Sequence, residues 1–448
     1  MKQAFESLGE FLFNELKGNE ELNLNLNGEQ STYLRFNKAQ VRQNTFVDQK
    51  FLSMSYQQDG RKVSFDLTLT GQADLDRQNG KFLLDRSRSE TQILPPDPFL
   101  VPMENRGQSS KVHEGKLPSA TDAINSIADT AKGSDFVGFY AAGPVFRGNL
   151  NSKGQKHWFS ANSFFVDYSL FTTNADGENK AVKGVYADTQ WDSQKFKVRM
   201  QASLDQLRPL AKKSTSLKPG SYRVYLAPGA VSEITGMLSW NALSYSAMKK
   251  GNCAFRKLHD KEKTLSPQFS LKENFALGLC PQFNSIGEVS AETLPLIQEG
   301  VLKNMLISAR AEKEFGVKSN GSDQGGWGFE YLRSPEISGG SLAEKDVLNK
   351  LGTGLFLSNL HYLNWSDEAH ARITGMTRYA CFWVEKGEIV GPIKDLRFDD
   401  SLFNILGAEL ENVTREQHID PAISTYFQRE LGGKKVPGMM IQKMSFTL

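Results

Sequence analysis

Residues 218–238 read Lys218-Pro-Gly-Ser-Tyr-Arg-Val-Tyr-Leu-Ala-Pro-Gly-Ala-Val-Ser-Glu-Ile-Thr-Gly-Met-Leu238, an apolar strand that leads into a helix. Pro228 suits the first helical turn, where a missing backbone N–H costs nothing. Gly251 follows two lysines and can adopt the left-handed conformation that often ends a helix. We therefore predict one helix of about six turns from Pro228 to Lys250, with four residues along its apolar face: Val231, Ile234, Leu238 and Ala242.

A second group of motifs lies further along the chain. Leu351-Gly-Thr-Gly-Leu355 is followed by Ile373-Thr-Gly375 and by Cys381-Phe-Trp-Val-Glu-Lys-Gly-Glu-Ile-Val-Gly-Pro-Ile393. In the last motif, Gly387 supplies the positive φ that a tight hairpin between two apolar strands needs. Together with the strand and helix after Lys218, the series resembles the TldD/TldE (PmbA) family. These proteins were once described as modulators of DNA gyrase and are regarded as two-subunit metallopeptidases.

The resemblance implies a zinc site that this chain does not reproduce. In the TldD branch the helix reads His-Glu-x-x-x-His, and a cysteine near the C-terminus completes the site. The matching positions are Ser232, Glu233 and Met237, and neither serine nor methionine is a good zinc ligand. No cysteine follows Cys381 in the sequence, and Arg429 stands where the third ligand would fall. The chain therefore resembles the TldE branch, the subunit without zinc, and we expect it to contain no catalytic residue and no metal ligand.

Glu233 and Gly236 also have ordinary structural explanations. A carboxylate in the first turns of a helix is stabilised by the helix dipole, so Glu233 is most simply a solvated or capping residue. Ligands five positions apart lie roughly 140° apart around a regular helix, so sharing a metal requires a π-type widening. Gly236 would permit that widening, and close packing of another segment against it is an equally good explanation.

Composition excludes several classes of function. Hydrophobic residues make up 39% of the 448 residues, which is enough for packed cores, and the length predicts two or three domains. A net charge of +2 gives no reason to expect nucleic acid or an anionic membrane as a partner. The sequence contains no apolar stretch of the roughly 18 residues that a membrane span needs. Its first helix is amphipathic, unlike a secretory signal. A cytoplasmic location is expected because the three cysteines are too few and scattered for a disulfide framework: Cys253, Cys280 and Cys381.

Two further groups of residues could in principle bind metal. His113-Glu114 looks like the start of a zinc-peptidase motif, but no second histidine follows at the required spacing. His361 and His370 flank Asp367 and Glu368 and could form a cluster of imidazole and carboxylate ligands. A polar loop with ordinary charges is the simpler interpretation of that segment.

The chain divides into four predicted segments. Residues 1–90 form an N-terminal α+β domain, residues 91–118 a proline-rich linker, residues 119–217 a middle segment, and residues 218–448 a C-terminal TldD/PmbA domain. Sheet and helix alternate without regular βαβ spacing, so we predict the α+β class. The resemblance implies a curved mixed sheet with helices at the N-terminus and a β-rich, barrel-like C-terminal domain surrounded by helices.

Local patterns predict the elements of the first half. β-branched and aromatic residues indicate strands, and caps with helical periodicity indicate helices. The predicted strands are 32–36, 41–46, 51–56, 63–69, 136–149, 158–173 and 183–189, and the predicted helices are 74–88, 119–131 and 192–212.

The function that the resemblance implies is that of a non-catalytic partner subunit. A TldD-like catalytic subunit would carry the zinc, and this chain would complete a chamber that admits an unfolded peptide. Peptide maturation and proteolysis are the implied processes. Two alternatives stay open: a stand-alone metallopeptidase that uses unconventional ligands such as His361 or His370, and a homo-oligomeric peptide-binding protein.

Overall fold

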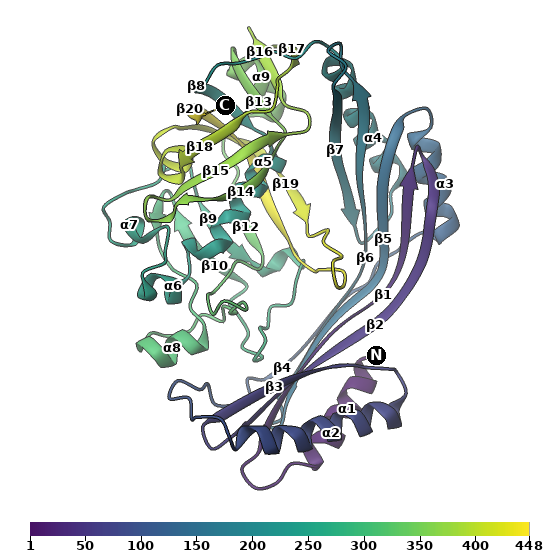
Figure 1. Ribbon diagram of the computed structural model, residues 1–448, viewed down its shortest axis with the longest axis vertical. Helices are drawn as coiled ribbons and strands as arrows, with labels where there is room; N and C mark the ends of the chain where they lie inside the picture. The colour runs from purple at the N-terminus through teal and green to yellow at the C-terminus, as the bar shows by residue number, and fades with distance from the viewer. Residues whose placement is uncertain (448) are drawn as a thin grey trace.

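The computed structural model describes residues 1–447. The chain up to Leu210 builds a long, curved sheet with helices along it, and a second, β-rich part from Gly220 faces this sheet (Figure 1). The strand order is β3-β2-β1-β5-β6-β4, with β7 also paired to β6, and the β4–β6 pair is parallel. The elements are α1 (Lys2–Asn14), β1 (Glu21–Asn37), β2 (Gln40–Gln58), β3 (Arg61–Thr68), α2 (Ala73–Thr91), β4 (Gln108–His113), α3 (Ala120–Ala131), β5 (Asp135–Asn151), β6 (Lys156–Thr173), β7 (Asn179–Asp188) and α4 (Ser193–Leu210).

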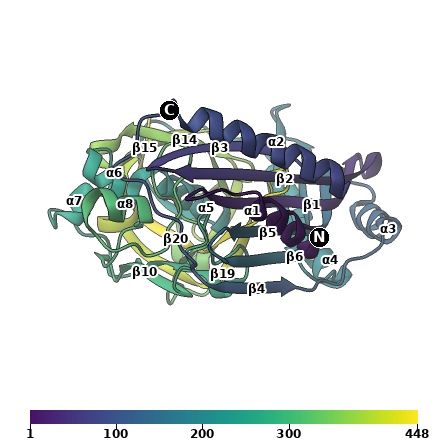
Figure 2. The same cartoon turned by 90° about the horizontal axis from the view of Figure 1, so that it is seen from below.

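Alternation of leucine and asparagine gives this sheet two different faces. Residues 22–27 of β1 read Leu-Asn-Leu-Asn-Leu-Asn, and successive strand residues point to opposite sides. The three leucines are fully buried in a core shared with α1 and α2, and further along β1 Leu34 and Phe36 pack in a core with α3 and α4. The three asparagines point the other way. Figure 2, which views the molecule from below, shows the strands side by side from β3 to β4, with α1 and α2 at the lower end of the sheet in Figure 1. The face without helices is polar and is turned toward the second part.

The strands after Gly220 form a thirteen-stranded sheet with branches. Its main path runs β11-β10-β9-β12-β20-β8-β13-β16-β17, and β14, β15, β18 and β19 pair beside it. The elements are β8 (Gly220–Leu226), α5 (Pro228–Met237), η1 (Leu238–Ala242), α6 (Tyr245–Lys250), α7 (Arg256–His259), β9 (Leu271–Asn274), η2 (Phe275–Leu277), β10 (Thr293–Gln298), β11 (Val301–Leu302), α8 (Ala309–Phe315), β12 (Pro335–Ile337), η3 (Glu344–Asp346), α9 (Val347–Leu351), β13 (Gly354–Leu357), β14 (Asn359–Asp367), η4 (Glu368–His370), β15 (Arg372–Arg378), β16 (Phe382–Glu385), β17 (Glu388–Pro392), β18 (Arg397–Ser401), η5 (Asn404–Ala408), β19 (Leu410–Pro421) and β20 (Gly433–Phe446).

The prediction of one continuous helix of about six turns is wrong. α5 ends at Met237, and in the π-type turn that follows Asn241 takes a φ of 72°. Asparagine tolerates this left-handed conformation better than most residues, and Ser244 then caps a new helix, α6, through its side chain. These local hydrogen-bonding preferences outweigh the apolar periodicity. The predicted end is confirmed, since Gly251 is left-handed with a φ of 86°.

The α+β class is confirmed, with two refinements. Within residues 1–447 the β-rich part is open, since β11 and β17 end its main strand path, so it does not form a closed barrel. The predicted strands 32–36, 41–46 and 51–56 are pieces of two much longer strands, β1 and β2. The polar residues on the face without helices have low strand propensity, so the sequence did not indicate that the strands are continuous. β1 nevertheless forms one long strand, because it pairs with β2 on one side and with β5 on the other.

The first three predicted segments contribute to one sheet. Residues 1–90 supply β1 to β3, residues 91–118 supply β4, and residues 119–217 supply β5 to β7. The domain boundaries themselves stay predictions.

Two loops of the β-rich part reach across to the polar face of the long sheet. The carbonyl oxygen of Ser285 accepts hydrogen bonds from the side-chain amides of Asn23, Asn25 and Asn149 at 2.8–3.1 Å. The loop between β19 and β20, residues 422–432, makes the second crossing (Figure 1). These two loops join the halves across the polar face, and the halves also meet where Phe382 packs in the core with α3 and α4 and where Arg310 forms an ion pair with Asp97.

Among residues 1–447, no helix combines the length and the apolar character that crossing a membrane requires. The three cysteines are buried and free.

Candidate functional site

A cavity of about 1300 Å³ lies between the long sheet and the β-rich part. On the sheet side, its wall is made by the polar face of β1, β2, β3, β5 and β7. On the other side, α5 and the facing ends of β19 and β20 contribute, and the loops that contain Ser285 and residues 422–432 also line it. Polar and charged side chains of the lining include Asn25, Asn27, Arg147, Lys183, Glu233, Arg333, His361, Asp420, Glu430 and Lys434.

The three degenerate motif positions do not share one environment. Ser232 and Met237 are almost fully buried, at 1% and 3% exposure, and Met237 belongs to the apolar core of the β-rich part. Glu233 is exposed to the cavity. Because α5 turns by about 100° per residue, neighbouring positions 232 and 233 point in different directions. One of the three positions therefore remains available to a ligand.

An ammonium group lies beside the first motif position. Lys434 Nζ donates to the backbone oxygen of Ser232 at 3.0 Å and lies 3.3 Å from its Oγ. The hydroxyl of Ser232 donates in turn to the carboxylate of Asp420. Lys434 follows the first residue of β20, and Asp420 is near the end of β19. The end of one hairpin thus supplies both charges around Ser232.

Gly236 also faces this ammonium group. A Cβ added at Gly236 would lie 3.4 Å from Lys434 Nζ, an ordinary contact distance, so this contact does not require a glycine. The π-type turn begins only at Leu238, after both motif positions. The helix is therefore not widened between positions 232 and 237, and close packing of Lys434 does not account for Gly236 either.

The cluster sets the pKa of Glu233. Although its side chain is accessible to the cavity, partial desolvation between the two cavity walls raises the pKa of this carboxyl above its usual range, Asp420 raises it further, and the positive charge of Lys434 opposes both effects. A zinc site needs imidazole or thiolate donors around an open position, whereas this cluster offers two carboxylates, a hydroxyl and a resident cation. The residues present do not fit zinc, and the arrangement is suited to binding polar or charged groups of a ligand.

Arg429 occupies a different place from the one that the sequence indicated. Its guanidinium is buried on the polar face of the long sheet, where it donates to Ser31 Oγ at 3.2 Å and to the oxygens of Gly143 and Ser163 at 3.0 Å. Lys434 is the residue of this tail segment that reaches the motif. The contact of Lys434 with α5 was not predicted, because no feature of the neighbouring sequence indicates that this lysine packs against a helix about two hundred residues earlier.

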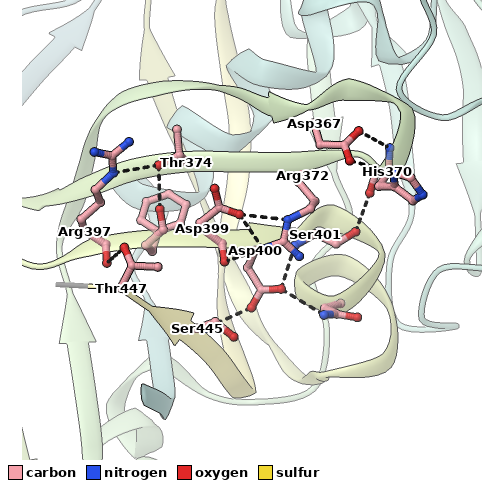
Figure 3. A network of polar contacts seen from close by, with 12 residues as sticks. Asp367, His370, Arg372, Thr374, Arg397, Asp399, Asp400, Ser401, Ser445 and Thr447 are labelled. Carbon is pink, nitrogen blue, oxygen red and sulfur yellow. Dashed lines mark hydrogen bonds and ion pairs between the residues drawn. The ribbon is translucent and has the colours of Figure 1, made fainter. Parts of the chain in front are cut away.

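The alternative histidine site is not assembled. His370 turns toward Asp367, with 2.8 Å between Nδ1 and the carboxylate, within a network that also includes Ser401 (Figure 3). His361 lines the cavity, where burial lowers its pKa. His113 lies on β4, with its ring against Phe159. Among residues 1–447, no group of three or more histidine, cysteine or acidic side chains is arranged to hold a metal ion.

Sequence comparison identifies the family. Residues 219–448, more than half of the chain, match the family model of the PmbA/TldA metallopeptidase C-terminal domain. The chain belongs to the PmbA/TldD family. The matched region contains α5, β19 and β20, so the cluster around Ser232 lies entirely within the family domain.

Curated members of the PmbA/TldD family match over part of their length. The chain is 30% identical to Metalloprotease PmbA of Escherichia coli O157:H7 over 122 residues, which cover 27% of this chain and 24% of that protein. It is 27% identical to the Metalloprotease PmbA homolog of Haemophilus influenzae over 183 residues, which cover 38% of this chain and 37% of that protein. The matches thus span about a quarter to somewhat over a third of these relatives.

Solved structures with the PmbA/TldD fold cover the whole chain. A protein of Thermotoga maritima described as a modulator of DNA gyrase has a TM-score of 0.79 at 14% identity, covering 99% of this chain and 100% of that one. TldE from Thermococcus kodakarensis has a TM-score of 0.78 at 13% identity, with the same coverage. At these identities the likeness shows the fold, which includes the long curved sheet as well as the family domain.

Proposed function

We propose that this chain is the non-catalytic, TldE/PmbA-like subunit of a TldD/TldE-type heterodimeric metalloprotease that acts on unfolded peptides. A TldD-like catalytic subunit carries the zinc, and this chain, which needs no cofactor of its own, completes the substrate chamber. The complex serves peptide maturation and proteolysis in the cytoplasm. Neither nucleic acid nor membrane is a partner in this proposal.

The Lys434 ammonium is the observation that supports a non-catalytic role most directly. It lies 3.0 Å from the backbone of Ser232, where the family's metal-binding helix would present its first ligand. Two unit charges of like sign about 4 Å apart repel by about 4 kcal/mol at an effective dielectric constant near 20, and a divalent ion doubles this penalty. Lys434 therefore opposes metal binding, and the missing imidazoles remove the attraction that could compensate.

The cavity supports the proposed substrate class. Its volume of about 1300 Å³ exceeds the usual 300–1,000 Å³ of small-molecule sites. Its wall carries side-chain amides, including Asn25 and Asn27, which can donate to and accept from a peptide backbone. The two crossing loops also line the cavity, and a ligand that lies between them and the sheet is more readily an extended segment than a folded domain.

Co-purification with the TldD-like protein of the same cell tests the proposal. We expect a stable one-to-one complex that hydrolyses unfolded peptides, with zinc in the TldD-like subunit alone by elemental analysis. This chain alone should show neither peptidase activity nor stoichiometric metal.

Two results would overturn the proposal. Stoichiometric zinc or iron in the isolated chain, lost together with activity in His361→Ala, would establish a stand-alone metallopeptidase. Self-association without any complex with the TldD-like protein would favour a homo-oligomeric peptide-binding protein. A His370→Ala variant is the matched control for the first result, because His370 is already paired with Asp367 outside the cavity wall.

A further inference from the structure

Arg147 differs from the other basic residues that line the cavity. It lies on β5, on the polar face of the long sheet, directly opposite Asn27 of β1. Among residues 1–447, no carboxylate lies within 4 Å of its guanidinium, which donates to two backbone oxygens, those of Phe146 at 2.9 Å and Arg429 at 3.4 Å. A guanidinium has five N–H donors, so most of its hydrogen-bonding capacity is not used by the protein.

The other three basic residues of the wall are already engaged. Lys183 forms an ion pair with Asp167. Lys434 binds the backbone and hydroxyl of Ser232. Arg333 donates to the carbonyl oxygens of the neighbouring loop and, at 2.6 Å, to the hydroxyl of Ser290. Arg147 is therefore the basic side chain of this wall that a ligand can engage without displacing a side-chain partner.

Arg147 carries a recessed positive charge that the nearby carboxylates do not contact directly. Burial lowers its pKa to about 10, while the negative charges of Glu29 and Glu430 act in the opposite direction. The group remains charged at neutral pH and is recessed in the cavity, where a charge without a partner is costly. A carboxylate matches the planar guanidinium with two parallel hydrogen bonds, and such charge-assisted pairs are among the strongest polar contacts.

We propose that Arg147 binds a carboxylate of the extended peptide held in the cavity, either its C-terminal carboxylate or an Asp or Glu side chain. Asn27, directly opposite on the neighbouring strand, lies beside this anchor and binds the peptide backbone next to it. The inference rests on the proposed peptide-binding function and adds a preference for acidic substrates. The peptide is thereby fixed against the sheet wall, across the cavity from Glu233, whose negative charge would repel the same carboxylate.

Binding of fluorescently labelled unstructured peptides to the full chain, measured by anisotropy alone and with the TldD-like partner, tests the inference. One set of peptides ends in a free carboxylate or an amide, and a second set carries Asp or Asn at one internal position. We expect the peptide with the relevant carboxylate to bind about tenfold more tightly than its neutral counterpart. Arg147→Gln should abolish this preference, and Arg147→Lys should retain part of it because charge remains without the bidentate geometry. The set that responds identifies the source of the carboxylate.

Lys183→Gln is the matched control, because it neutralises another basic residue of the wall whose charge is already paired. It should leave the preference unchanged, and thermal unfolding should show that each variant is folded. An equal preference in wild type and Arg147→Gln, or no preference in wild type, would overturn the role of Arg147 while leaving peptide binding intact. Absence of binding by every peptide, charged or neutral, would instead contradict the proposed function and this inference together.

Discussion

The two walls of the cavity are built in opposite ways. The sheet wall follows from a local pattern, since the alternation over residues 22–27 sends leucines to the helices and asparagines to the cavity. The opposite wall is assembled from distant parts of the chain: Ser232 meets Asp420 and Lys434, which lie 188 and 202 residues away. The first wall depends on burial of apolar side chains and the second on charges brought together by folding.

This difference predicts how each wall responds to change. A wall set by strand alternation should tolerate substitutions on its polar face and fail when its apolar face is altered. A wall held by interacting charges should respond to pH and to the loss of single charged partners. The predictions below test this contrast in order of decreasing effect.

Leu24→Asn should cause the largest loss of stability. Leu24 is fully buried beneath α1 and α2, so the substitution removes apolar contacts and buries an amide without partners. We expect a loss of about 4 kcal/mol in the free energy of unfolding, measured by urea denaturation. Asn27→Leu, on the other face of the same strand, should change stability by about 0.5 kcal/mol or less. Similar losses for both variants would contradict the two-faced description of the sheet.

Arg429→Met should weaken the connection between the two walls. The substitution keeps an unbranched apolar stem but removes the donors to Ser31, Gly143 and Ser163. We expect a loss of about 3 kcal/mol in denaturation experiments and faster hydrogen exchange in residues 422–432. Arg415→Met, an exposed arginine of β19, should cost about 0.5 kcal/mol or less and leave exchange in the loop unchanged. A small effect of Arg429→Met would mean that the loop is held by its other contacts.

Glu336→Gln should reveal the acid sensitivity of the β-rich part. Burial raises the pKa of Glu336, but hydrogen bonds from Asn274 at 2.5 Å, Lys435 at 3.0 Å and Gln417 at 3.2 Å outweigh it and lower the value to about 2. Because the folded-state pKa is depressed from 4.5, the stabilisation is complete above pH 4.5 and is lost as pH falls toward 2.

The variant should therefore cost about 2 kcal/mol at pH 7 and show a smaller decline of stability between pH 4.5 and 2. Urea denaturation across this pH range provides the measurement. Glu344→Gln, which neutralises a more exposed carboxylate of the same part, is the control and should leave the acid dependence unchanged. Parallel pH profiles for wild type and Glu336→Gln would show that this carboxylate is not responsible.

Lys434→Met should have the smallest effect on stability and a clear effect on the pKa of Glu233. Lys434 lowers that pKa and Asp420 raises it, so Lys434→Met should raise the pKa of Glu233 further and Asp420→Asn should lower it. A raised carboxyl pKa in the folded state means that stability falls as pH rises through it, so the loss of about 1 kcal/mol should appear at neutral pH and shrink in acid. NMR titration of Glu233 in the three proteins measures both shifts. Shifts of the same sign in the two variants would contradict this electrostatic description.

The parts of the fold that local patterns specify were predictable. Helical periodicity predicted α2, α3 and α4 within a few residues of their observed bounds, and Gly251 ends its helix as expected. The end of α5 was not predictable from apolar periodicity, because Asn241 and Ser244 redirect the backbone through their own conformational and capping preferences. The length of β1 was missed because polar residues on one face conceal a strand whose other face is buried.

For the candidate site, the sequence predicted which ligands are missing but not which residues surround the motif. The sequence alone showed that zinc donors are missing at Ser232 and Met237, because the motif lies within one short stretch of the chain. Lys434 and Arg147 were not found from the sequence. Lys434 is distinguished by its contact with Ser232, and Arg147 by having only backbone partners, and both features depend on tertiary structure. The alternation at residues 22–27 was a usable signal for the polar wall: asparagine at every second strand position, opposite buried leucines, marks a face that must meet polar surroundings.

The position of Arg429 in the chain also has a consequence for biosynthesis. Its acceptors, at residues 31, 143 and 163, leave the ribosome at least 266 residues before the arginine itself. Since chains emerge from the N-terminus, the long sheet can form while this crossing loop has not yet been translated. The cavity can therefore remain open on this side until the loop is synthesised and Arg429 binds its acceptors.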